Sequence, residues 1–259
     1  MQIKDQVAFV TGAGQGIGRA AALKLAEAGA TVVAVDINPK TAEDTASAVA
    51  ALGRQSLALA ADLGNVADID RAFDAAVAKF GRVDTLVNNA GVTRRAYIMD
   101  LTEEDWDRIH RVNAKGVFFC LQRAARDMIP RRDGRIINIA SIAGKGYEGT
   151  SNAVYAASKG AVIALTKTAA QQLGRHNITV NAVCPGVVKT AIVAEMMRVD
   201  SEKLGLSIAD VEKKFVAGIP LQRANEPDDI ADMIVFLASP GARNVTGQSL
   251  NVDGGLIPN

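Results

Sequence analysis

Short apolar runs alternate with longer, alanine-rich amphipathic stretches along the whole chain. Apolar runs rich in valine, isoleucine and alanine are typical of strands buried on both faces, and the amphipathic stretches are typical of helices. Strict strand–helix alternation implies right-handed crossovers, which place parallel strands in one sheet covered by helices. The sequence therefore predicts an α/β, Rossmann-type fold, with a doubly wound parallel sheet of about seven strands and helices on both faces. The predicted strands cover residues 7–11, 31–36, 56–60, 85–88, 135–139, 179–183 and 249–252, and the predicted helices cover 17–28, 41–52, 66–80, 103–128, 153–173 and 227–238.

The alternation continues through all 259 residues without a linker, a tandem repeat or a low-complexity tract. This predicts a single nucleotide-binding domain over residues 1–259. The rhythm breaks once, between Gly186 and Pro220, where no strand is predicted and the sequence has a polar helical character. Long excursions from compact domains are often lids, so we expect a substrate lid around residues 186–220.

Composition excludes several classes of protein. The net charge of +1 lacks a long run of like charge, and the pair Arg131-Arg132 is too small for a nucleic-acid surface. No apolar run approaches the roughly 20 residues that span a bilayer, and no secretory signal precedes the first strand. We expect a cytoplasmic protein without nucleic-acid or membrane partners. The histidines are isolated and the cysteines, Cys120 and Cys184, lie far apart, which predicts buried thiols and no metal site.

A glycine-rich turn follows the first strand, with the sequence T-G-A-G-Q-G-I-G at residues 11–18. The strict G-x-G-x-x-G pattern fails, because Ile17 stands where its third glycine would be. The pattern T-G-x-x-x-G-x-G fits instead, with Gly12, Gly16 and Gly18. Positions without a side chain let the backbone turn sharply and approach a pyrophosphate at the N-terminus of the next helix. The turn predicts a dinucleotide site, with an ordinary glycine turn as the alternative.

Asp36 ends the second predicted strand, eighteen residues after Gly18. An acidic side chain there accepts hydrogen bonds from the 2′-hydroxyl of the adenosine ribose and repels a 2′-phosphate. Neither Gln15 nor Ile37 supplies a compensating cation, so we expect NAD rather than NADP. Asp62, after the third strand, is interpreted as an adenine contact, with an N-terminal cap of the next helix as the alternative.

Tyr155 and Lys159 lie four residues apart on a predicted helix, so their side chains share one face. Oxidising an alcohol requires a base for the hydroxyl proton, and a free tyrosine has a pKa near 10. Bringing the phenol near neutrality needs about 4 kcal/mol of differential stabilisation, much of which an adjacent ammonium can supply. Ser141 follows a predicted strand end and would hydrogen-bond the reacting oxygen.

These residues together resemble the classical short-chain dehydrogenases/reductases over essentially the whole chain. The motifs that carry the resemblance are T-G-x-x-x-G-x-G at 11–18, N-N-A-G at 88–91, Asn113, Ser141, Y-x-x-x-K at 155–159, P-G at 185–186 and V-D-G-G at 252–255. The resemblance implies hydride transfer between nicotinamide and a secondary alcohol or ketone. The chain departs from the extended relatives, which have T-G-x-x-G-x-x-G and a longer C-terminal domain, and this argues against epimerisation.

The resemblance also implies roles for single positions. Tyr155 would be the acid/base, Ser141 its partner on the substrate, Lys159 a ligand of the nicotinamide ribose, and Asn113 the holder of a relay water. Asn88 would stabilise the central strand. The predicted cofactor contacts are Gly12, Gln15, Gly16, Ile17, Gly18, Asp36, Ile37, Asp62, Leu63, Asn89, Ala90, Gly91, Tyr155, Lys159, Pro185, Gly186, Val188 and Thr190. The predicted substrate contacts are Ser141, Glu148, Asn152 and Tyr155, and Arg94 and Arg95 are placed at the same mouth.

Three functions stay open. The favoured one is a dehydrogenase of a small diol or sugar alcohol, because the segment after Pro185 resembles acetoin/butanediol and hexitol dehydrogenases and because Glu148 and Asn152 can bind hydroxyls. The second is a 3-oxoacyl-[acyl-carrier-protein] reductase, which shares all motifs; NADPH would suit it, and Asp36 argues against it. Four arginines could dock its acidic carrier: Arg126, Arg131, Arg132 and Arg175. The third, a non-catalytic nucleotide sensor, conflicts with the intact catalytic set.

Small residues along the helix at 153–173 and aromatic residues near 117–129 favour close helix pairing. The same residues would otherwise pack on the sheet. The family resemblance implies that these helices pair across a two-fold axis, so we expect a homotetramer.

Overall fold

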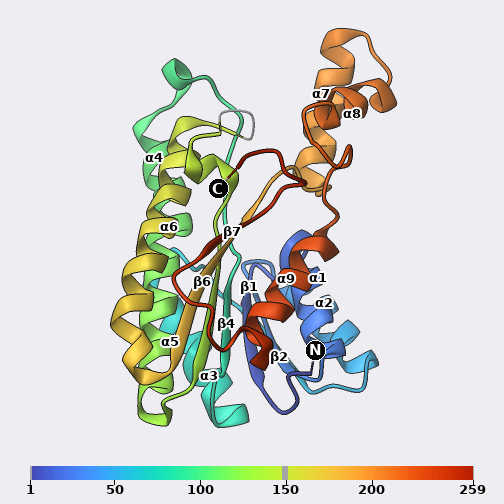
Figure 1. Ribbon diagram of the computed structural model, residues 1–259. Coiled ribbons are helices and arrows are strands. Elements are labelled where there is room, and N and C mark those ends of the chain that lie inside the picture. The colour runs from blue at the N-terminus through green and yellow to red at the C-terminus, as the bar shows by residue number, and fades with distance from the viewer. Residues whose placement is uncertain (1, 148–150, 259) are drawn as a thin grey trace.

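A parallel sheet forms the centre of the molecule in the computed structural model, which describes residues 2–147 and 151–258 (Figure 1). Its seven strands within these residues lie in the order β3-β2-β1-β4-β5-β6-β7, and every neighbouring pair is parallel. The strands are β1 (Val7–Thr11), β2 (Thr31–Asp36), β3 (Ser56–Ala60), β4 (Thr85–Asn88), β5 (Gly134–Ile139), β6 (Ile178–Pro185) and β7 (Ser249–Val252). The predicted fold class and all seven predicted strands are confirmed.

The strand order reverses between β1 and β4. The chain builds outward from β1 to β3, returns to β4 beside β1, and then builds outward on the other side to β7. Such a reversal opens a crevice at the carboxyl ends of the central strands, where ligands bind in open parallel sheets. β1 and β6 are buried along their whole length, which agrees with their apolar composition.

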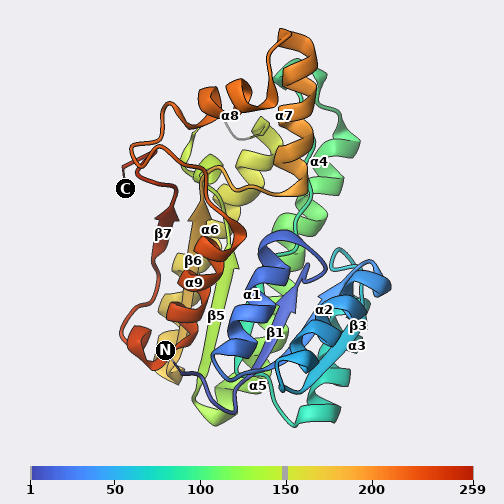
Figure 2. The ribbon, with the colours of Figure 1, turned by 90° about the vertical axis from the view of Figure 1, so that its right-hand side faces the viewer.

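Helices cover both faces of the sheet (Figures 1 and 2). Residues of α1, α2 and α9 pack in one hydrophobic cluster, and residues of α3, α5 and α6 pack in the other. The helices of the two layers are α1 (Gly16–Glu27), α2 (Pro39–Ala51), α3 (Val66–Phe80), α5 (Val117–Arg131), α6 (Ala153–Leu173) and α9 (Pro227–Ala238). Cys120 and Cys184 are buried free thiols, as predicted. Among the described residues, no helix has both the length and the apolar character needed to cross a membrane.

The predicted helix over 103–128 is present, but it is not a uniform α-helix. The chain forms α4 (Glu103–His110), then a π-helical segment, η2 (Arg111–Gly116), and only then α5. The wider turn places Gly116 against the loop that follows β3. A Cβ at Gly116 would lie 2.5 Å from the Leu63 carbonyl oxygen. π-helical turns are rare and are frequent at functional sites. Here the segment contains Asn113, which is fully buried.

The segment after β6 is helical, as its sequence predicts. It forms α7 (Ala191–Leu204) and α8 (Ile208–Val216), which stand beyond the carboxyl ends of the strands (Figures 1 and 2). The two ends of the excursion are held together at its base, where Asn225 N donates to Val187 O and Lys189 N donates to Asn225 O, both at 2.8 Å. These two bonds pair the ends of the excursion where it leaves and rejoins the body.

Candidate active site

The residues predicted to act on substrate and cofactor gather at the carboxyl ends of the central strands. β1 leads into the glycine turn, β2 ends at Asp36, β4 leads into N-N-A-G, and β5 leads to Ser141. The fold thus brings to one edge groups that are more than one hundred residues apart in the chain. Tyr155 and Lys159 reach the same region from the first turns of α6.

The glycine turn has the shape that a phosphate site requires. Gly12 and Gly16 have φ values of +61° and +54°, which side chains rarely tolerate, and a Cβ at Gly18 would overlap the Gly12 carbonyl oxygen. α1 begins at Gly16, and its N-cap residue Gln15 makes no side-chain capping bond, so the first N–H groups of the helix stay open to an anion. Ile17 is partly buried beside the turn. The turn therefore fits the pyrophosphate of a dinucleotide.

Asp36 is held in place by backbone amides rather than by a cation. Its Oδ2 accepts from Gly14 N at 2.9 Å, and its Oδ1 accepts from Asn38 N at 3.0 Å. The carboxylate keeps further acceptor capacity for a ribose hydroxyl. Ile37, which follows it, is 71% exposed. Gly14 was not predicted as part of this site; its side-chain-free position is explained by Thr41, whose hydroxyl a Cβ would overlap.

Asp62 has a partner that the sequence did not reveal. Its Oδ2 accepts from Arg111 Nη1 at 2.7 Å and its Oδ1 accepts from Gly64 N at 2.8 Å. Burial alone would raise the pKa of Asp62, but the Arg111 bond and charge and the Gly64 amide hold it below its usual value. The adjacent Leu63 is buried. The N-cap of α3 is Asn65, so the alternative role of Asp62 as that cap is wrong.

The N-N-A-G segment is clamped to the glycine turn. Asn89 Nδ2 donates to the carbonyls of Thr11 and Gly12, both at 3.0 Å. The hydroxyl of Thr11 accepts from the amides of Asn89 and Ala90 at 2.9 and 3.0 Å. Gly91, the last residue of the segment, is exposed. The side chains of Asn89 and Thr11 thus hold the two predicted cofactor loops together.

Asn88 acts inside the sheet, as predicted. Its amide donates to Asn138 Oδ1 at 2.9 Å, and Asn138 Nδ2 donates to Thr166 Oγ1 at 2.9 Å. These three side chains are at most 2% exposed. A satisfied buried chain of this kind fixes β4, β5 and α6 relative to one another.

Lys159 lies buried between Tyr155 and the end of β5. Its Nζ donates to Ile139 O at 2.7 Å and lies 5.7 Å from the centroid of the Tyr155 ring. Only 3% of the residue is exposed, and burial lowers the pKa of Lys159 to about 8. The i, i+4 pairing predicted from the sequence is thus present, with the ammonium adjacent to the phenol.

Ser141 and Tyr155 face each other across the site. Burial raises the pKa of Tyr155 to about 12, and the hydrogen bond to the Ser141 hydroxyl opposes that rise. Ser141 Oγ also accepts from Ala143 N at 3.1 Å, which orients the hydroxyl. The protein groups around the phenol therefore do not by themselves bring its pKa toward neutrality. A bound nicotinamide cation would favour the phenolate further.

Asn113 connects the π-helical segment to the loop after β4. Its Oδ1 accepts from Val92 N at 2.8 Å, and its Nδ2 donates to Val92 O at 2.9 Å and to Ser158 Oγ at 3.2 Å. Since every polar side-chain atom is occupied, a role in holding water would fall to its backbone carbonyl. π-helical geometry frees backbone carbonyls from the ordinary i to i−4 pattern.

The predicted residues after β6 line the other side of the crevice. Pro185 ends β6, and Gly186 packs so closely on Asp253 that a Cβ would lie 2.7 Å from its Cβ. Val188 is buried and pairs with Asn225. Thr190 is the N-cap residue of α7 and makes no side-chain capping bond, and its methyl group lies 3.5 Å from where a Cβ of Gly16 would be. This segment therefore stands directly across from the glycine turn.

The predicted substrate contacts fare differently. Ser141 and Tyr155 lie at the site, whereas Glu148 lies outside the described residues. The amide of Asn152 is already used within the protein, with Oδ1 accepting from Tyr155 N at 2.8 Å and Nδ2 donating to Arg94 O. The Arg94 guanidinium is paired with Asp105 rather than directed at a ligand. Asn152, predicted to bind substrate hydroxyls, and Arg94, predicted to line the same mouth, thus have partners within the chain, and Asn152 also lines the hollow beside the site.

A hollow of about 420 Å³ lies over the first turn of α6, beside the loop that follows Ser141. Its walls are mainly small residues with two tyrosines, and they include Ala96, Tyr97, Ala143, Gly146, Tyr147 and Ala156. Within the described residues, no group of three histidine, cysteine or acidic side chains has a metal-binding arrangement.

Comparisons with known proteins agree with this geometry. A family model described as Enoyl-(Acyl carrier protein) reductase matches residues 12–257. The 3-oxoacyl-[acyl-carrier-protein] reductase FabG of Staphylococcus epidermidis is 41% identical over 257 residues, covering 97% of this chain and 99% of the relative. The (2S)-[(R)-hydroxy(phenyl)methyl]succinyl-CoA dehydrogenase subunit BbsD of Thauera aromatica is 39% identical over 255 residues, covering 98% of each. The solved structure of NAD+-bound xylitol dehydrogenase superposes with a TM-score of 0.91 at 32% identity, covering 98% of this chain and 100% of that one.

Proposed function

This chain belongs to the classical short-chain dehydrogenase/reductase family of oxidoreductases, and from that membership we propose that it transfers a hydride between NAD(H) and a small secondary alcohol or its ketone. The family acts on CH–OH groups and binds a nicotinamide cofactor. The observation that carries the choice of NAD is Asp36, whose carboxylate ends β2 and is held by two backbone amides. The NAD+-bound xylitol dehydrogenase, with the same fold, supports the same cofactor.

The residues of the site divide the chemistry among them. When bound, the cofactor supplies the ring that accepts or donates the hydride. Tyr155 takes the hydroxyl proton in oxidation and returns it in reduction, and Ser141 holds the reacting oxygen against it. Lys159 places a positive charge beside the phenol and would bind the nicotinamide ribose, and the backbone carbonyl of Asn113 would hold a water for the proton relay. We propose these roles for the four residues together.

We propose a small diol or sugar alcohol as the substrate. The likeness to xylitol dehydrogenase supports this class. The second candidate is reduction of 3-oxoacyl thioesters on an acyl carrier, which the relatives near 40% identity support. On the surface, Arg132 donates to the Arg175 carbonyl at 3.0 Å, so two exposed arginines lie side by side for an acidic carrier. Arg131 is not available for this, because it is bonded to Asp84.

A matrix of substrates and cofactors tests the proposal. The purified protein is assayed with vicinal diols, pentitols, hexitols and 3-oxoacyl thioesters, each with NAD(H) and NADP(H). We expect turnover of diols or polyols with NAD. Efficient reduction of 3-oxoacyl thioesters with neglect of every diol and polyol would replace the first candidate by the second.

Cofactor choice gives a first prediction. We expect NAD to exceed NADP in kcat/KM by about tenfold or more, equivalent to about 1.4 kcal/mol, because the Asp36 carboxylate repels a 2′-phosphate. Asp36→Ala should narrow the gap by weakening NAD and by removing the repulsion. Asp44→Ala removes an exposed carboxylate from the following helix and serves as the control. Equal use of both cofactors by the unaltered protein would contradict the assignment.

We also propose that α7 and α8 form a lid that closes over the substrate. The lid is tied to the loop after β4 by Arg95 and Asp200, with Nη1 and Oδ2 3.1 Å apart, and to its own base by Lys189 and Glu212 at 3.0 Å. Exposed ion pairs of this kind contribute about 0–1 kcal/mol, which permits opening.

Limited proteolysis tests the lid. Cleavage between Thr190 and Val216 should be slowed by NAD together with substrate, and Asp200→Asn should speed cleavage of the free protein. A cleavage rate in this segment that does not respond to ligands would contradict closure.

Assembly follows from an exposed stripe on one side of the molecule. Ala157, Ala161 and Ala164 lie exposed on the outer face of α6, and Phe118 on neighbouring α5 is 41% exposed. Small residues let helices approach closely, and an aromatic side chain beside them supplies buried area. We propose a homotetramer that pairs these helices. Light scattering should show four copies, and Ala161→Arg should break this contact; a monomer at micromolar concentration would contradict it.

A further inference from the structure

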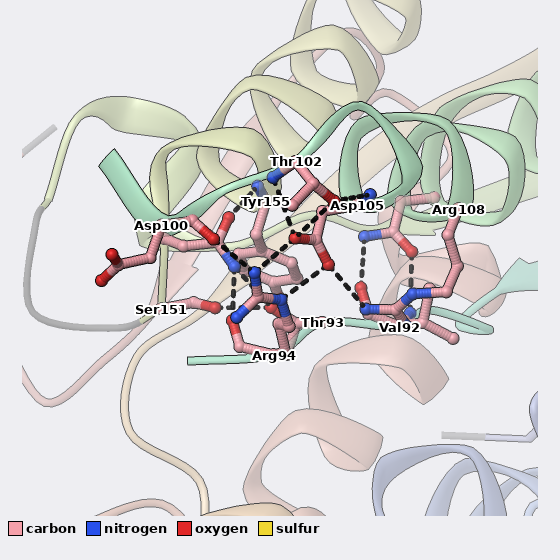
Figure 3. Close-up of polar contacts among 11 residues, drawn as sticks. Val92, Thr93, Arg94, Asp100, Thr102, Asp105, Arg108, Ser151 and Tyr155 are labelled. Atoms are coloured by element: carbon pink, nitrogen blue, oxygen red, sulfur yellow. Dashed lines mark hydrogen bonds and ion pairs between the residues drawn. The ribbon is translucent and has the colours of Figure 1, made fainter. Parts of the chain in front are cut away.

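We propose that Asn152, Arg94 and Asp105 are positioning residues for the reaction, which together clamp the first turn of α6 to the loop after β4 and thereby fix the place of Tyr155. The proposal rests on the proposed function, because it concerns the same site. None of the three side chains is assigned to the reacting groups. Figure 3 shows the contacts between Arg94 and Asp105, beside Tyr155.

Asn152 links the start of the catalytic helix to the loop. Its Oδ1 caps α6 by accepting from Tyr155 N at 2.8 Å, so the cap binds the catalytic residue itself. Its Nδ2 donates to the carbonyl of Arg94 and lies 3.4 Å from Thr93 Oγ1. The side chain is buried, with 8% of the residue exposed. The Asn152 side-chain amide thus joins α6 to the loop after β4, and both its oxygen and its nitrogen are hydrogen-bonded.

Arg94 and Asp105 anchor the loop. Arg94 Nε donates to Asp105 Oδ1 at 2.6 Å, its Nη2 donates to Asp105 Oδ2, and Nη2 also donates to Asp100 O at 2.7 Å. Asp105 is 7% exposed and forms a capping box with Thr102 at the start of α4. The Arg94 guanidinium holds the pKa of the Asp105 carboxyl well below its usual range, so the pair stays charged at neutral pH. A two-point pair of this kind fixes direction as well as distance.

The same loop also binds Asn113, which is proposed to take part in the proton relay. Residue 92 binds both polar atoms of the Asn113 side chain through its backbone, and Asn113 lies in the π-helical segment that continues α4. The connections therefore form a closed circuit. One series of contacts begins at Asp105 in α4 and continues through Arg94 and Asn152 to Tyr155. A second begins at Asn113, in the π-helical segment after α4, and reaches Val92. The two series meet in the loop at residues 92–94.

A closed circuit of this kind sets the distance between Tyr155 and Asn113 without touching substrate or cofactor. Reacting groups have to be held within fractions of an ångström of their productive geometry, and a displacement of about 1 Å costs about 10²-fold in rate. Breaking the clamp should therefore lower kcat of the folded protein, whether or not it also lowers the stability. A merely structural role would lower stability and leave kcat of the folded protein unchanged.

Two substitutions at Asn152 separate these roles. Serine is a good N-cap, so Asn152→Ser keeps the cap of α6 but loses the amide that reaches Arg94, whereas Asn152→Ala loses both. We expect kcat to fall by about 10- to 100-fold in both variants, with little change in the KM for NAD. Only Asn152→Ala should lower the unfolding midpoint clearly.

A second pair of variants tests the anchor. Arg94→Gln removes the charge that pairs with Asp105, and we expect kcat to fall by about tenfold. The matched control is Arg123→Gln, because Arg123 is also paired with carboxylates, with Asp74 at 2.7 Å and Asp127 at 2.9 Å, but joins α3 to α5. The control should lose stability and keep wild-type kcat.

Each part of the proposal is contradicted by a different experimental result. Wild-type kcat in Asn152→Ser, with loss only in Asn152→Ala, would reduce Asn152 to a helix cap and overturn the clamp. Wild-type kcat in Arg94→Gln would contradict the proposed role of the Arg94–Asp105 pair in fixing the loop. If the unaltered protein turns over no alcohol or ketone, the proposed function fails. In that case the clamp is tested by titrating the Tyr155 phenol by absorbance. The Tyr155 signal is the difference between each protein and the same protein carrying Tyr155→Phe. An ionisation of Tyr155 that is the same in Asn152→Ser as in the unaltered protein would overturn the clamp.

Discussion

Replacing Tyr155 by phenylalanine should lower kcat by about 10²–10⁴-fold in both directions, because the variant has no group that exchanges a proton with the substrate oxygen. The effect should fall on kcat, since the ring and its packing remain. Cofactor affinity should change little, because the contacts of the glycine turn and Asp36 are untouched. Steady-state kinetics with the best substrate of the panel measures the loss, and a fluorescence titration with NADH measures the affinity.

The sign of the pH dependence follows from the same residue. Oxidation needs the phenolate, so kcat/KM for the alcohol should rise with pH, and reduction needs the phenol, so kcat/KM for the ketone should fall as pH rises. Burial raises the pKa of Tyr155 to about 12 in the protein alone, so the phenol should titrate at high pH without cofactor, and the rise in kcat/KM should lie at lower pH than that titration because the nicotinamide cation favours the phenolate. A near-normal rate in Tyr155→Phe, with an unchanged unfolding curve, would show that another group is the acid/base.

Replacing Lys159 by methionine should remove activity and change how stability depends on pH. Loss of one preorganised charge beside the reacting groups typically costs on the order of 10²–10³-fold in kcat. Burial lowers the pKa of Lys159 to about 8 from 10.5, so the unfolded chain binds this proton more tightly than the folded chain does. Protonation therefore favours unfolding below pH 8, and the cost fades as pH rises from 8 to 10.5.

The gap between the two pKa values corresponds to about 3 kcal/mol. The free energy of unfolding of the unaltered protein should accordingly gain on that of Lys159→Met by about this amount between pH 7 and pH 10.5. Lys167→Met, on an exposed position of the same helix, is the control and should run parallel to the unaltered protein. Parallel curves for Lys159→Met as well would mean that Lys159 is not held in a charge-disfavouring environment.

Part of this site is readable from the sequence because its geometry is local. Tyr155 and Lys159 share a helix face through their spacing alone, and Gly12, Gly16 and Gly18 describe a turn whose shape depends on a few dihedral angles. Asp36 is placed by the end of a strand that its own valines define. In each case the distance that matters spans a few residues of one element, or one strand and the turn after it.

Other parts were decided only by the tertiary structure. The sequence over 103–128 reads as one helix, because a π-helical turn widens the helix by a single residue and hardly disturbs the apolar pattern. Arg111 meets Asp62 because the loop after β3 lies beside that turn, although forty-nine residues separate them. Neither residue carries a local signal of the other.

The same holds for the substrate side. From the sequence Asn152 and Arg94 read as polar groups at an open mouth, and the fold turns them toward each other and toward Asp105. Spacing along one element determines which side chains share a face, whereas contacts between elements depend on the order of strands and on the path of the loops that join them. The sequence by itself therefore determined the fold class, the glycine turn and the Tyr155–Lys159 pair. The tertiary structure decided the clamp around Tyr155, because it joins three segments that meet only when β4, α4 and α6 are packed.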